Sequence, residues 1–247
     1  MFEKIIEFEA PEEYIKNNQD LLPTPIKLNI PEWYKELKHH VNHKTIKGCM
    51  PFLDSLMAGY LLKLPTDFYI EHNVEIEGKP ATQVVSANRF RPNLGLKINV
   101  NYDNVGEYHD PNQLGKSKLV EKNKNLPFHK ILNPWIIKTP PGYSCIFTPP
   151  LNNRDDRFEI ISGIVDTDSF NTEINFPIVI NGDKYPTLKT TLKIGTPYVQ
   201  IIPFKRDNWK MKIKKSDIKE KNENEFFMMR HVLENYKKKF WRKKTWK

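Results

Sequence analysis

Short apolar runs of strand length, separated by turn-forming residues, fill the middle of this chain and restrict what it can fold into. Many short strands with Pro, Gly, Asn and Asp between them are typical of a barrel, a sandwich or a related all-β architecture. We therefore expect a mainly β fold. The predicted strands are Tyr60 to Leu64, Phe68 to Ile70, Gln83 to Val85, Leu96 to Val100, Trp135 to Ile137, Ser144 to Thr148, Phe158 to Ile161, Glu173 to Ile180 and Tyr198 to Phe204.

The pattern changes twice along the chain and so predicts three parts. Residues 1–48 contain several prolines and one short helical pattern after Pro31, which indicates an N-terminal arm with a short helix. Residues 49–206 form the predicted β domain, in which the polar residues 101–125 are expected to be a long excursion or a flexible loop. Residues 207–247 are expected to form a C-terminal amphipathic helix and a basic tail.

That C-terminal helix has a predicted start and a predicted apolar face. Asp217 and Glu220 have the spacing of a capping box at a helix N-terminus. Five apolar residues then recur at helical spacing, so we expect them to pack on the β domain or on another subunit. They are Phe226, Met229, Leu233, Tyr236 and Phe240.

The cysteines and the start of the chain bear on its cellular location. Cys49 and Cys145 stand far apart and form no Cys-x-x-Cys pair, so we expect neither a disulfide scaffold nor a cysteine zinc site. A reducing compartment, the cytoplasm, fits best. The first residues carry acids where a signal peptide needs bases. No stretch approaches the roughly 18 consecutive apolar residues of a membrane-spanning helix, so we expect no membrane span.

The net charge of +9 is concentrated at the C-terminal end. The last twelve residues contain seven basic and no acidic residues, whereas the rest of the chain has 32 basic and 30 acidic ones. Aromatic residues are interleaved with these cations, as single-stranded nucleic acid binding requires. An anionic membrane surface, an acidic protein and a merely solubilising tail are alternatives. The candidate polyanion-binding residues are Lys237, Lys238, Lys239, Arg242, Lys243 and Lys244.

Five segments between residues 49 and 206 form a distinctive set of motifs. They are Cys49-Met-Pro-Phe-Leu-Asp, Gly59-Tyr-Leu-Leu-Lys-Leu-Pro, Pro134-Trp-Ile-Ile-Lys-Thr-Pro-Pro-Gly-Tyr-Ser-Cys-Ile-Phe-Thr-Pro-Pro, Gly163-Ile-Val-Asp-Thr-Asp and Asn175-Phe-Pro. Together they resemble an uncharacterised family found in marine bacteriophages and some bacteria. The resemblance implies a phage or bacterial source, hence host cytoplasm or virion if the protein is phage-encoded. It brings no known activity.

The order of three motifs carries a second, more distant resemblance. Pro141-Gly-Tyr143 is followed by Gly163-Ile-Val-Asp166-Thr-Asp168 and then by Gly195-Thr-Pro-Tyr-Val-Gln200. This order is similar to that of the trimeric dUTPase and dCTP deaminase superfamily, which implies a β-clip fold and a homotrimer. The resemblance places Asp166 at a nucleotide site, where a carboxylate can act as general base. Mg²⁺ would accompany a bound nucleotide.

The chain also departs from that superfamily. Pro150-Leu-Asn152 stands where dUTPases grip phosphates with Arg-Ser-Gly, the first-motif aspartate has no counterpart near Gly59, and the glycine-rich C-terminal arm is missing. These departures put triphosphate hydrolysis in doubt. Arg154 or Arg157 is a candidate replacement for the phosphate grip, since a guanidinium binds phosphate in a bidentate manner. A solvated ion-pair loop is the alternative for these arginines.

The candidate site therefore has Asp166 and Asp168 as catalytic residues and Arg154, Arg157, Gln200 and Tyr143 as substrate-binding residues. In a strand, Asp166 and Asp168 would lie on one face, where they could bind a divalent cation or share a proton. In the other interpretation they are turn residues. We expect Asp166, Asp168 and one of the two arginines to border a common pocket, with subunits contributing to it.

No dedicated metal site is predicted. His39 and His43 have helical i, i+4 spacing, but they lack an acidic base between them and a third ligand. Two functions remain open from the sequence. One is a protein that binds or modifies a nucleotide at the Asp166 region. The other is a non-enzymatic phage structural, assembly or interaction protein whose basic tail binds a polyanion.

Overall fold

The computed structural model describes residues 4–40, 45–74, 81–87, 108–230 and 235–247, and the chain divides into two compact units. The β unit consists of residues 1–24 and 59–205. The split unit combines residues 25–58 with residues 206–247. The sequence pattern instead predicts three consecutive parts, divided at residues 48 and 206. The two divisions differ because a pattern along the chain does not show which distant segments pack together.

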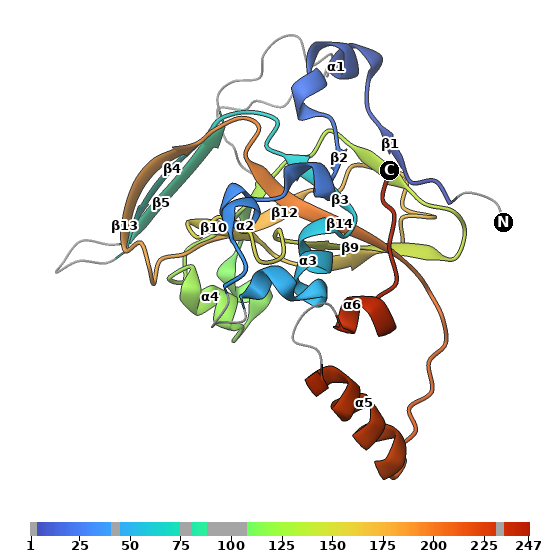
Figure 1. Ribbon diagram of the computed structural model, residues 1–247. Helices are drawn as coiled ribbons and strands as arrows, with labels where there is room; N and C mark the ends of the chain where they lie inside the picture. The colour runs from blue at the N-terminus through green and yellow to red at the C-terminus, as the bar shows by residue number, and fades with distance from the viewer. Residues whose placement is uncertain (1–3, 41–44, 75–80, 88–107, 231–234) are drawn as a thin grey trace. The chain divides into compact units, whose positions relative to one another are not determined.

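Fourteen strands in four antiparallel sheets, with six helices, occur in the described residues (Figure 1), which confirms the prediction of a mainly β protein. The sheet orders are β11-β9-β14-β3-β2, β10-β12-β7-β6, β13-β4-β5 and β1-β8. The strands are β1 Glu7–Glu9, β2 Thr24–Pro25, β3 Tyr60–Lys63, β4 Phe68–Asn73, β5 Thr82–Ala87, β6 Tyr108–His109, β7 Phe128–Ile131, β8 Ile136–Lys138, β9 Tyr143–Thr148, β10 Phe158–Ile160, β11 Gly163–Val165, β12 Phe176–Ile180, β13 Thr187–Leu192 and β14 Pro197–Lys205.

Every predicted strand that falls on described residues overlaps an observed one, and Leu96 to Val100 lies outside those residues. Of the two expectations for residues 101–125, the flexible loop is wrong for the described part. That part contains β6, a 3-10 turn at Pro111–Leu114 and the helix α4, Lys118–Lys122. Asp110 and Ser117 accept hydrogen bonds from backbone amides at the start of these turns, so short polar residues set this local structure.

The core of the β unit is built from the buried apolar residues of several strands. In β4, Phe68 and Ile70 are buried at alternate positions, as the period of two predicts, whereas β14 buries the consecutive residues 198–201. Tyr14 of helix α1, Glu12–Asn17, packs edge-to-face on Trp135 with ring centroids 5.6 Å apart. The N-terminal segment therefore helps to cover the core.

A glycine permits the close approach of two strands in the largest sheet. Gly59 precedes β3 and has φ +77°, a left-handed conformation that favours glycine. A Cβ atom built there would lie 1.9 Å from the carbonyl oxygen of Ile201 on β14. Position 59 therefore requires glycine both for its backbone angle and for space.

The split unit contains helices α2, Glu32–Glu36, α3, Met50–Met57, α5, Ile218–Arg230, and α6, Asn235–Lys239. Tyr34 of α2 stacks on Phe52 of α3 at 5.9 Å between ring centroids. Lys47 donates from Nζ to the carbonyl oxygens of Tyr34 (2.7 Å) and Lys35 (3.1 Å). These aromatic and polar contacts help to hold the first segment of this unit.

The predicted C-terminal helix is present as two helices. The carboxylate of Asp217 accepts hydrogen bonds from the amides of Lys219 (2.9 Å) and Glu220 (3.2 Å), so Asp217 caps α5 as predicted. Phe226, Tyr236 and Phe240 of the predicted apolar face stay 58%, 39% and 37% exposed. The side chains of Met229 and Leu233 lie outside the described ones. No helix among the described residues has the length and apolar character that a membrane crossing needs.

Candidate functional site

Asp166 and Asp168 lie in a turn that follows β11. Asp166 accepts a hydrogen bond from Ser144 Oγ (2.6 Å), and Asp168 accepts one from the backbone amide of Gly142 (2.8 Å). The carbonyl oxygen of Asp166 accepts from the amide of Phe170 at 3.0 Å, which closes the turn. Asp166 and Asp168 are therefore turn residues, which was one of the two interpretations of the sequence. Their carboxylates bind this turn to the start of β9.

Thr167 reinforces the same connection. It is buried, and its hydroxyl lies 2.7 Å from that of Thr139, while its carbonyl accepts from the Thr139 amide at 3.2 Å. Tyr143 begins β9 between the two residues that bond the carboxylates, and Lys4 lies 4.7 Å from the centre of its ring. The structure therefore brings Asp166, Asp168 and Tyr143 to one end of β9.

Gln200 lies on β14 beside the opposite end of β9. It is buried on β14 opposite Thr148, and its side-chain oxygen accepts a hydrogen bond from the Leu151 amide at 2.8 Å. This contact fixes the turn after β9. An amide side chain is suited to the task, since a buried acceptor needs a donor nearby.

The two candidate arginines follow that turn and are engaged in ion pairs. Arg157 forms a bidentate pair with Asp155, with Nε 3.0 Å and Nη2 2.6 Å from its oxygens, and donates to Thr190 at 3.0 Å. The Asp155 carboxylate raises the pKa of Arg157. Arg154 pairs with Glu159 at 2.9 Å. Both arginines thus form ion pairs, as the second interpretation of the sequence, an ion-pair loop, expects.

The predicted site residues therefore form two groups. β9 has six residues, and at roughly 3.3 Å per residue its ends are about 17 Å apart. Asp166 follows the β11 residue that pairs with Cys145 near the start of β9, whereas Gln200 pairs with Thr148 at its end. Arg154 and Arg157 lie beyond that end in sequence. The common pocket of carboxylates and arginines remains a prediction.

The histidine pair and the metal question can be answered only for part of the chain. α2 ends at Glu36, so His39 follows the helix rather than lying on it, and His43 is outside the described residues. Within the described ranges, no group of three or more His, Cys, Asp or Glu side chains is arranged to hold a metal ion.

The basic C-terminal region makes specific contacts with α3. The indole Nε1 of Trp241 donates to both carboxylate oxygens of Asp54 at 3.0 Å. Lys244 Nζ lies 2.5 Å from Asp54 Oδ2 and 5.6 Å from the centre of the Trp241 ring. The Asp54 carboxylate on α3 thus binds two side chains of the C-terminal region.

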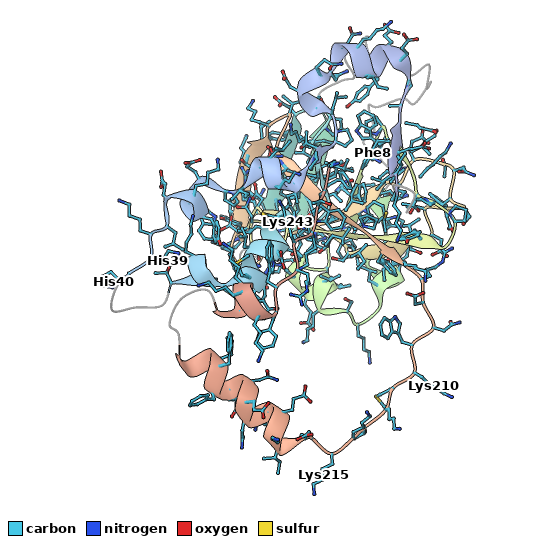
Figure 2. The ribbon with its side chains drawn as sticks, turned by 45° about the vertical axis from the view of Figure 1, so that its right-hand side comes forward. Phe8, His39, His40, Lys210, Lys215 and Lys243 are labelled. Carbon is cyan, nitrogen blue, oxygen red and sulfur yellow. The ribbon has the colours of Figure 1, made fainter. Side chains whose placement is uncertain are left out.

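Other cations of this region lie on its surface among aromatic rings. Lys239 Nζ is 4.7 Å from the ring centre of Phe227 and 5.2 Å from that of Phe240, which are cation–π distances. Lys237, Lys238, Arg242 and Lys243 are exposed, and Figure 2 labels Lys243. Exposed cations beside partly exposed Tyr236 and Phe240 are the groups that neutralise phosphates and stack on bases.

The structure adds a feature that the count of the last twelve residues missed. The split unit carries 20 basic and 9 acidic residues, whereas the β unit carries 19 basic and 21 acidic ones. Lysines between residues 210 and 221 belong to this basic unit. Their signal in the sequence is a run of alternating lysines from Lys210, which a tally of the extreme C-terminus leaves out.

No protein-family model, no curated protein and no solved structure matches this chain.

Proposed function

We propose that this protein is a non-enzymatic interaction protein that binds single-stranded nucleic acid through the C-terminal part of its split unit. The separation of charge between the two units carries this proposal. The cations of residues 206–247 number 15 against 6 acids, and aromatic residues lie among them. Phosphate neutralisation and base stacking together give sequence-tolerant binding of a single strand.

The contacts around Asp54 support the proposal because they order the binding surface. A basic tail without fixed contacts would pay the full ordering entropy on binding. Here Trp241 and Lys244 already contact α3, and Lys239 lies between two rings. The neighbouring exposed cations Lys237 and Lys238 therefore start from a partly ordered backbone.

The test measures the salt dependence of binding. A labelled single strand should bind with a slope of log affinity against log salt that contains about −0.7 for each neutralised phosphate. Replacing Lys237, Lys238 and Lys243 together by Ala should reduce that slope by about 2. The matched control replaces the exposed β-unit lysines Lys116, Lys189 and Lys193 by Ala and should leave the slope unchanged. An equal effect of both variants would contradict the proposal.

A nucleotide site at the Asp166 turn is the second candidate function, suggested by the resemblance to the dUTPase superfamily. The exposed carboxylate of Asp166 and the nearby Tyr143 are the observations that favour it. Under this function the β unit would have a β-clip fold, act as a homotrimer and bind Mg²⁺ with the nucleotide. A thermal midpoint raised by a deoxynucleotide with Mg²⁺, and not raised in Asp166→Asn, would favour it.

A further inference from the structure

An extended segment between β14 and α5 exposes three large apolar side chains. Residues 206–217 form no helix or strand, and Figure 2 labels Lys210 and Lys215 on this segment. Trp209, Met211 and Ile213 are 91%, 88% and 87% exposed. Single exposed apolar residues are common on surfaces, but three in alternation with such high exposure form a continuous unburied face.

The sequence of this segment has the period of a half-buried strand. Lys210, Lys212 and Lys214 alternate with the three apolar residues. In an extended chain, alternate side chains point to opposite faces, so one face is apolar and the other cationic. Strict alternation of this kind is typical of a strand that pairs within a sheet and buries one face. The described residues of the same chain supply no such pairing.

The β unit has an open sheet edge that such a strand would fit. Within the described parts of the chain, β11 pairs with β9 on one side and with no strand on the other. Ile164 in the middle of β11 is 65% exposed. A Cβ atom built on Gly163 would meet no atom within 4 Å, so the face of the sheet opposite the Ile164 side chain is also open at this strand. An edge with unpaired backbone groups is a template for strand addition.

Charge decides between two ways in which copies of the chain could pair. Antiparallel pairing of the segment with itself, centred on Met211, would place Lys210 directly opposite Lys212 of the other copy. Like charges directly opposite are destabilising, and an isolated two-stranded ribbon is marginal in water. Addition to β11 avoids this lysine–lysine pairing and joins the basic segment to a unit that carries 21 acidic and 19 basic residues.

We propose that residues 209–213 of one copy add as a strand to the free edge of β11 in a second copy of this chain. Trp209, Met211 and Ile213 would then share a face with Ile164, because cross-strand neighbours lie on the same face of a sheet. Reciprocal donation by both copies closes the assembly, so the contact does not propagate into a fibre.

The first experiment measures association by sedimentation velocity across a concentration series. The wild-type chain should sediment as an associated species at tens of micromolar. Replacing Trp209, Met211 and Ile213 by Ser should shift it to the monomer. The matched control replaces Lys210, Lys212 and Lys214 by Ser and should remain associated. A wild-type protein that is monomeric throughout, or an apolar-face variant that associates as the wild type does, overturns the proposal.

The second experiment tests the strand partner with introduced cysteines in a Cys49→Ser background, where the remaining Cys145 is buried. Ile164→Cys combined with Trp209→Cys, Met211→Cys or Ile213→Cys should give disulfide-linked dimers for at least one of the three registers. Ile164→Cys with Lys210→Cys or Lys212→Cys should give none, because those side chains point to the other face. Equal cross-linking from both faces contradicts a strand. A monomer whose apolar face binds only anionic lipid vesicles or a single strand would assign the face to that ligand and also overturn the proposal.

Discussion

The β unit and the split unit are held together by different forces. The β unit has a continuous core of buried strand residues and is nearly neutral. In the described part of the split unit the buried hydrophobic residues are Ile26, Tyr34, Met50 and Leu56, and the surface is strongly basic. Clustered like charges repel one another and oppose compaction. The comparison teaches that this chain places its charged, exposed surface where packing is lightest and keeps the packed unit free of excess charge.

The largest expected effect concerns the packed unit. Gly59→Ala should destabilise it by about 3 kcal/mol or more, because the added methyl group would overlap the Ile201 carbonyl at a left-handed backbone position. Denaturant unfolding followed by circular dichroism measures the loss. The control Gly142→Ala also has a positive φ, +84°, but meets no atom within 4 Å, so it should cost about 1–2 kcal/mol. Equal losses for both variants would show that the strand contact at Gly59 is not a constraint.

A smaller effect comes from a buried histidine in the same unit. His72 on β4 is fully buried, its Nδ1 lies 2.8 Å from Gln83 Oε1, and its Nε2 has no partner in the described residues. Burial lowers the pKa of His72, with Lys124 adding to the decrease and the Gln83 hydrogen bond opposing it. The folded state therefore binds fewer protons than the unfolded state below the unfolded pKa of about 6.5.

The sign of the pH dependence follows. The contribution of His72 to stability is complete above about pH 6.5 and is lost as the pH falls toward the lowered pKa of the folded state, with a slope of at most about 1.4 kcal/mol per pH unit. Urea unfolding at pH 7.5 and 5.5 should show a weaker pH dependence for His72→Gln than for the wild type. The exposed His39→Gln should retain the wild-type dependence. The same pH dependence of stability in all three proteins would contradict a contribution from His72.

The sequence predicted the packed unit far better than the split unit, for a physical reason. Apolar runs such as Ser144 to Thr148 become strands, because the buried side chains of a core strand leave a short apolar run in the sequence. β13 was missed because only Leu192 of its six residues is buried, and backbone pairing with β4 fixes its position. The split unit depends on single contacts between distant residues, such as Trp241 with Asp54, and such contacts leave no period in the sequence.

The candidate site shows the same division. The turn at Asp166 and the ion pair of Arg157 with Asp155 were both among the sequence interpretations, since each involves residues close in the chain. The bond of the Gln200 side chain to the Leu151 amide depends on the register of β14 against β9. A sequence alone does not give that register, so the placement of these residues at two ends of β9 could not be predicted.

The smallest expected effect tests how the lightly packed unit is held. Asp54→Ala removes the acceptor of the Trp241 indole and the partner of Lys244. One hydrogen bond contributes about 0.5–1.5 kcal/mol net, and a pair with an exposed lysine adds little. We expect the free energy of opening the C-terminal region to fall by about 1 kcal/mol. Trypsin cleavage after the lysines between residues 237 and 244 should then be roughly five times faster, because cleavage follows the open population.

The matched controls separate a held tail from a solvated one. Glu36→Ala removes an exposed carboxylate from the same unit and should leave the cleavage rate unchanged. Asp54→Asn keeps one acceptor oxygen for the indole and should give an intermediate rate. A lysine-rich tail that is merely solvated would be cleaved equally fast in all four proteins, and its removal would leave the thermal midpoint unchanged. In that case the contact of Trp241 and Lys244 with Asp54 would contribute nothing to the stability of the C-terminal region. The two units would then differ in charge, and not in how their segments are held.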